Sequence, residues 1–109
     1  MTNDEYQEFT KTTAVYPSGE VGIDYVILGM VAEAGEVAGK WAKYKRGDYN
    51  VGIDRLSGDM DSEVGDLLWF ISQYCNETDT TIEALMEMNM IKLRDRQKRG
   101  VLKGNGDTR

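Results

Sequence analysis

The sequence predicts an all-α fold in a single domain, and three observations indicate it. Apolar residues recur at steps of three and four along two long stretches, the only proline lies outside both, and a helix-capping pattern precedes a further helix. The chain has 109 residues, which is the size of one domain. We therefore expect one domain over residues 1–109, built from four helices.

The first two predicted helices flank a turn that contains Pro17. Residues 3–14 are expected to form a short helix. After the turn, a helix of about six turns is expected over residues 24–45, because no proline interrupts it and apolar residues recur at helical spacing. These apolar residues are Val26, Met30, Val37 and Trp41.

Three glycines lie inside this second helix, at Gly29, Gly35 and Gly39. A glycine within a helix costs up to about 1 kcal/mol relative to alanine. We therefore expect close packing against another helix to favour them.

The third helix is expected to follow a loop over residues 46–59, where glycine, aspartate and asparagine are frequent. It should begin near Asp59 to Asp61 and end near Asn76. One face of this helix is predicted to be buried. Its residues are Val64, Leu67, Leu68, Ile71, Tyr74 and Cys75.

A capping box predicts the start of the fourth helix, since Thr80 precedes Glu83 by three residues. This helix should end near Lys98. The tail over residues 100–109 contains three glycines and little periodicity, so we expect it to be extended and to order against a partner or substrate.

The amino-acid composition excludes several classes of function. The chain has no histidine, which removes histidine-based nucleophile arrangements and metal ligands, and its net charge of −6 argues against nucleic-acid binding. No apolar run approaches the ~20 residues of a membrane span, and the N-terminal residues lack the pattern of a secretory signal. We expect a cytoplasmic protein. A lone domain this short leaves much apolar surface uncovered, so oligomerisation is expected as well.

Two pairs of acidic residues are the main candidates for chemistry. Glu33 and Glu36 are three apart in the second predicted helix, and Glu63 and Asp66 are three apart in the third. Residues at this spacing share one helix face, so two packed helices would bring four carboxylates together. Oxygen ligands of this kind suit Mg²⁺, with Mn²⁺ as a substitute. The alternative is a solvated acidic face with ordinary ion pairs, such as Glu36 with Lys40.

A basic face on the fourth helix complements these acids. Asn89, Lys92 and Arg96 follow one another at steps of three and four. Cationic and amide donors suit the far side of a polyphosphate bound to metal. We predict that Lys92 and Arg96 contact phosphate.

These motifs resemble the MazG-like nucleotide pyrophosphohydrolases of the all-alpha NTP pyrophosphatase superfamily. The segments that carry the resemblance are GMVAEAGEVAGKWAKYKRG, SEVGDLLWFISQYC and MNMIKLRDRQKRG, in the order the family uses. One departure is Ala32, where many members have a further glutamate.

The resemblance implies a four-helix MazG-like bundle completed by a homodimer or homotetramer. It implies Mg²⁺ ligands at Glu33, Glu36, Glu63 and Asp66. Residues implied to contact the nucleotide are Asn89, Lys92 and Arg96, with Lys43 as a weaker candidate. The implied reaction converts a nucleoside triphosphate to the monophosphate and pyrophosphate, for control or cleaning of the nucleotide pool.

Within that reaction, Glu36 and Glu63 are the candidate catalytic carboxylates, with Glu36 the first candidate for the base. No pattern in the sequence selects a particular nucleobase. A different class of function is a non-catalytic helical interaction module whose acidic face docks a basic partner. If the protein is such a module, neutralising single carboxylates should cause graded losses of partner binding that are sensitive to salt. The enzyme predicts near-complete loss of turnover.

Overall fold

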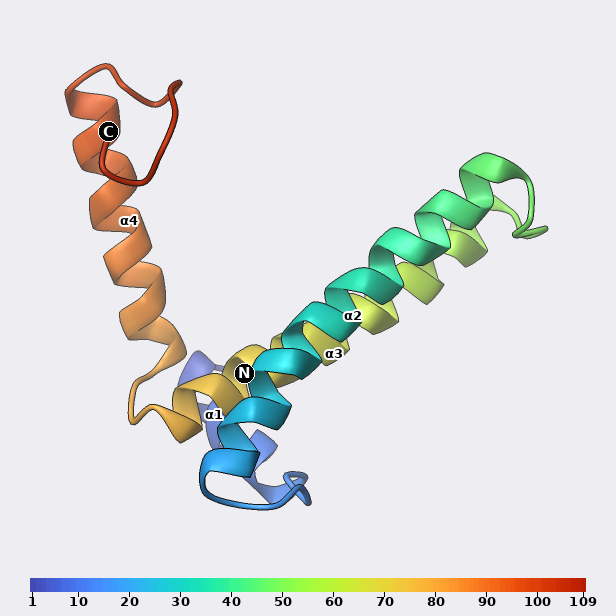
Figure 1. The fold of residues 1–109 in the computed structure, drawn as a ribbon, viewed down its shortest axis with the longest axis horizontal. Coiled ribbons are helices and arrows are strands. Elements are labelled where there is room, and N and C mark those ends of the chain that lie inside the picture. The colour runs from blue at the N-terminus through green and yellow to red at the C-terminus, as the bar shows by residue number, and fades with distance from the viewer.

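The computed structural model describes residues 1–109, which form four α-helices and no strand. The helices are α1 (Asn3–Thr12), α2 (Glu20–Arg46), α3 (Ile53–Glu77) and α4 (Ile82–Lys98). α2 and α3 form a long hairpin, α1 packs beside α3, and α4 projects away as an arm (Figure 1). The prediction of an all-α, four-helix fold is confirmed. None of the helices combines the length and the apolar composition that crossing a membrane requires.

The predicted start of the third helix was wrong. α3 begins at Ile53, so only residues 47–52 separate it from α2. Leu56 is completely buried in this added segment, and Arg55 pairs with Asp59 one turn later, with Nε to Oδ1 at 3.2 Å. Because α2 extends to Arg46, a partner helix lies opposite the segment, and the burial it provides outweighs the helical cost of Gly58.

The fourth helix begins one residue later than the capping pattern indicated. Thr81 is the N-cap, and its hydroxyl accepts a hydrogen bond from the backbone N–H of Ala84. The tail also differs from the expectation of an extended segment. It contains no helix or strand, yet it turns back over the end of α4 (Figure 1) because side chains of α4 and of the tail bind its backbone.

Polar side chains join α1 to the end of the hairpin that leads into α4. The Thr10 and Ser72 hydroxyls are 2.7 Å apart and both residues are completely buried. The amide of Gln7 donates to Asn76 and to the Thr80 carbonyl, and its oxygen accepts from the Ile82 N–H. Since Gln7 contacts both sides of the turn between α3 and α4, it helps to set the direction of the arm.

Much apolar surface is uncovered in the single chain. Only 11 of 109 residues are buried, and the radius of gyration is 17.1 Å, compared with about 13 Å for a compact domain of this length. The predicted buried face of α3 is correct at Cys75 but not at Val64 or Leu68, which are exposed. The single chain has no helix to cover them.

Close packing explains only one of the three helical glycines within this chain. A Cβ atom at Gly29 would lie 2.1 Å from the Phe70 ring, whereas nothing lies within 4 Å of the Cβ position at Gly35 or Gly39. The expectation of close packing is therefore confirmed for Gly29 and wrong for the other two.

Candidate active site

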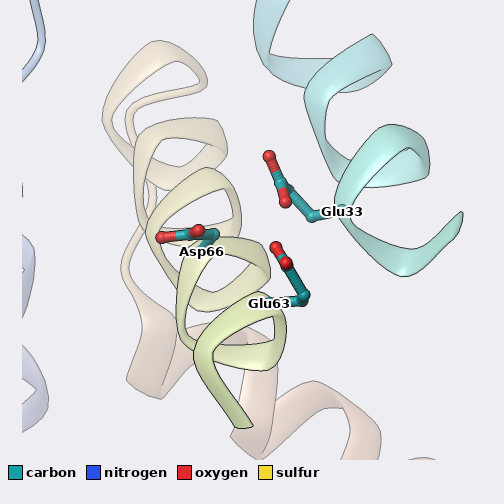
Figure 2. A group of neighbouring side chains, drawn as sticks. All are labelled: Glu33, Glu63 and Asp66. Carbon is teal, nitrogen blue, oxygen red and sulfur yellow. The ribbon is translucent and has the colours of Figure 1, made fainter. Parts of the chain in front are cut away.

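Three carboxylates meet where α2 packs against α3. Glu33 on α2 faces Glu63 on α3, and Asp66 lies one turn further along α3 (Figure 2). One oxygen from each residue lies within 4.8 Å of the others. The structure therefore brings together three of the four predicted metal ligands, and it does so across two helices, as the paired spacing predicts.

The electrostatics of this acidic cluster, Glu33, Glu63 and Asp66, favour a cation. Burial raises the pKa of Glu33, and the neighbouring carboxylates of Asp66, Glu63 and Glu36 raise it further. Burial, and then the charge of Asp66, raise the pKa of Tyr6 on α1. Mutual repulsion of this kind is relieved when a positive ion binds between the acids.

Lys40 supplies part of that positive charge within the chain. Its Nζ lies 2.8 Å from Oε1 of Glu63, and both side chains are about four-fifths shielded from solvent, with exposed fractions of 21% and 19%. The hydrogen bond to Glu63 raises the pKa of Lys40. The sequence placed Lys40 only in a local pair with Glu36. Its contact with Glu63 was missed because it depends on how α2 packs against α3.

Glu36 stands apart from the cluster of three. It is exposed on α2, one turn after Glu33, and none of its oxygens belongs to the group that lies within 4.8 Å. Its charge still contributes to raising the pKa of Glu33. Glu36 thus lies at the edge of the cluster.

The predicted phosphate-binding residues do not reach the acidic cluster in the single chain. Asn89, Lys92 and Arg96 are all on α4, which contacts α1 and α3 but not α2. Figure 1 shows the arm directed away from the middle of the hairpin. Lys43 is exposed near the end of α2 and makes no ion pair. One chain therefore separates the acidic and basic parts of the predicted site.

Comparison with known families shows which family this chain belongs to. Residues 23–101 match the model of the MazG nucleotide pyrophosphohydrolase domain. The chain belongs to the MazG family. It is also 37% identical to the Gene 37 protein of Mycobacterium phage L5, over the full length of both chains. No solved structure matches it. The resemblance inferred from the three sequence segments is confirmed.

The MazG match spans the acidic cluster, its lysine and the basic residues of α4, while the last eight residues of the tail lie outside it. The chain is thus a MazG pyrophosphohydrolase domain. MazG domains typically use a divalent metal, and the acidic triad of Glu33, Glu63 and Asp66 is present in this one.

An open recess borders the acidic cluster of this MazG domain. It has a volume of about 310 Å³ and extends from Glu33 towards the aromatic ring of Phe70, which lies 5.6 Å from the Tyr25 ring between centroids. Its lining residues are Tyr25, Leu28, Gly29, Ala32, Glu33 and Phe70. Tyr25 and Phe70 were not predicted as site residues from the sequence, because only the packing of α2 on α3 places them beside the acids.

Proposed function

We propose that this MazG domain is a Mg²⁺-dependent nucleoside triphosphate pyrophosphohydrolase, which cleaves between the α and β phosphates. The observation that carries the proposal is the acidic cluster of Glu33, Glu63 and Asp66 between two helices of a MazG-family chain. The products would be a nucleoside monophosphate and pyrophosphate. Control or cleaning of the nucleotide pool is the corresponding cellular role.

The donor set fits Mg²⁺ or Mn²⁺ because it consists of carboxylate oxygens alone. Glu33, Glu63 and Asp66 would hold the ion, with Glu36 as a fourth ligand from the edge of the cluster. When bound, the ion would activate water and neutralise the charge of the polyphosphate. The raised pKa of Glu33 supports this assignment, since a cation bound beside it would favour the charged form of the carboxylate.

Glu36 is our first candidate for the base that accepts a proton from the attacking water, since its carboxylate is exposed beside the cluster. Water oxygen would attack the α phosphorus while the bond to the bridging oxygen breaks and pyrophosphate leaves. Glu63 is the second candidate, and Lys40 would hold its carboxylate in position. The recess beside Glu33 would receive the nucleobase, which Tyr25 and Phe70 could contact.

We also propose that the enzyme is a homodimer or homotetramer in which α4 of one copy completes the site of another. Exposed apolar side chains on α4 support an assembly through this arm. They are Met86, Met88, Met90, Ile91 and Leu93. In such an assembly, Asn89, Lys92 and Arg96 of one copy would contact the nucleotide held by the acids of its neighbour, with Lys43 as an additional phosphate contact.

Complementation between two inactive variants should test this exchange. One carries Glu63→Gln and the other carries Lys92→Ala with Arg96→Ala. In mixed dimers, one of two sites would combine intact acids with intact cations, so equal mixing should restore about one quarter of the wild-type rate. The measurement is pyrophosphate release after the two chains are unfolded and refolded together. Activity no higher than the sum of the separate variants would contradict a shared site.

The reaction itself is tested by phosphorus NMR with a panel of ribo- and deoxyribonucleoside triphosphates. We expect monophosphate and pyrophosphate to appear with Mg²⁺ and not with EDTA. The amount of product formed from each nucleotide would also rank the nucleobases by preference. Release of inorganic phosphate in place of pyrophosphate, or no turnover of any nucleotide, would contradict the proposed cleavage.

A further inference from the structure

The tail places a carboxylate against the two cationic side chains that we propose bind phosphate. Oδ1 of Asp107 accepts hydrogen bonds from Nη2 of Arg96 at 2.9 Å and from Nζ of Lys92 at 3.2 Å. The same Arg96 nitrogen donates to the backbone oxygen of Asp107 at 2.6 Å. Arg96 is 5% exposed, so it is shielded from solvent although residues 86–95 and 97–98 of the same helix are exposed.

The tail is held in this position by further contacts of its own backbone. The guanidinium of Arg109 donates to the carbonyl oxygens of Val101 and Leu102, at 3.2 and 3.1 Å. Arg99 on the preceding turn donates to the backbone oxygen of Arg109 at 2.8 Å. A left-handed φ of 71° at Gly100 starts the turn. The returning tail is therefore an ordered loop whose two ends are joined by hydrogen bonds.

Carboxylate and phosphate oxygens make the same type of charge-assisted hydrogen bond with arginine and lysine. Both cations are therefore engaged by an anionic group before any nucleotide arrives. The two cations also hold the pKa of Asp107 below its usual range, so the carboxylate stays charged near neutral pH. A polyphosphate that uses these donors has to displace the carboxylate.

We propose that residues 100–109 form an autoinhibitory strap, in which Asp107 occupies the phosphate-binding cations Lys92 and Arg96 until polyphosphate displaces it. This inference rests on the phosphate role given to these residues in the proposed function. Asp107 lies beyond residues 23–101, so the carboxylate that occupies the two cations is outside the family match. The strap would add a regulatory contact to the proposed phosphate-binding site.

Asp107→Asn tests the strap because it removes the competing charge with little change in shape. Tripolyphosphate in EDTA is the probe, since without metal it reports on the cations alone, and its dissociation constant is measured by calorimetry. We expect Asp107→Asn to bind it about three- to tenfold more tightly than wild type. The KM for nucleotide should fall to a similar extent while kcat is unchanged.

Asp95→Asn is the matched control. It removes a carboxylate from the same arm, but that carboxylate pairs with Arg99 at 2.7 Å rather than with the two phosphate cations. We expect it to bind tripolyphosphate within about twofold of wild type. If both variants bound tripolyphosphate more tightly by the same factor, the change in net charge would explain the effect, and the strap would be overturned.

The outcomes separate the strap from the hydrolase. Unchanged or weaker tripolyphosphate binding by Asp107→Asn, in a wild type that hydrolyses nucleotides, would overturn the strap and leave the enzyme. Tighter binding that Arg96→Gln abolishes, in a chain that hydrolyses nothing on the nucleotide panel, would support the strap and reject the enzyme.

Discussion

Glu63→Gln should lower kcat for nucleotide hydrolysis by about 100-fold or more while the helical content stays that of wild type. Glu63 lies at the centre of the acidic cluster, because it faces Glu33 across the two helices and also binds Lys40. Glutamine keeps the size of the side chain but removes one negative charge from the metal ligands. Pyrophosphate release and circular dichroism measure the two parts of the prediction.

Metal binding gives a second measurement of the same variant. Mn²⁺ titration followed by electron paramagnetic resonance should show weaker binding in Glu63→Gln. Asp61→Asn is the matched control, since it neutralises an exposed carboxylate on α3 that lies outside the cluster. The control should bind Mn²⁺ and turn over nucleotide at close to wild-type levels.

Wild-type turnover by Glu63→Gln would show that the site is assigned wrongly. A non-catalytic interaction module would give a different result from either of these. In that case, neutralising any single carboxylate would weaken docking of a basic partner by a similar and salt-sensitive amount. The enzyme instead requires an effect concentrated on the cluster.

Gly29→Ala should destabilise the fold by about 2–3 kcal/mol, which is the largest effect on stability that we expect from a single methyl group. The added Cβ would lie 2.1 Å from Cε1 and 2.4 Å from Cζ of Phe70, so α2 and α3 would have to separate or the ring would have to turn. Phe70 is buried, with 8% exposed, and turning its ring would disturb its packing against the rings of Tyr25 and Trp69. Urea denaturation measures the free energy of unfolding.

Gly39→Ala on the same helix provides the contrast. Nothing in the chain lies within 4 Å of its Cβ position, so helix propensity alone should stabilise the fold by up to about 1 kcal/mol. Phe70→Leu in the Gly29→Ala background should recover part of the lost stability, because it removes the ring atoms that clash. Equal changes at the two glycines would show that α2 and α3 do not pack as described.

Much of the fold was predictable because it depends on local periodicity. The stretches around Val26 and Cys75 show helical spacing and both residues are buried. Helix boundaries were less predictable. The extension of α3 to Ile53 depends on burial of Leu56 opposite α2, and no residue within the loop sequence signals that partner.

The sequence by itself determined that the fold is four helices and that acids are paired on two of them, since these follow from spacing along the chain. It also indicated the family, through the resemblance of three segments to MazG-like proteins. Only the tertiary structure decided which groups meet. It joined Glu33 with Glu63 and Asp66, attached Lys40 to Glu63, kept the basic arm away from the acids, and placed Asp107 on Arg96. The physical reason is that contacts between separate helices depend on their relative packing, which short-range spacing along one helix does not encode.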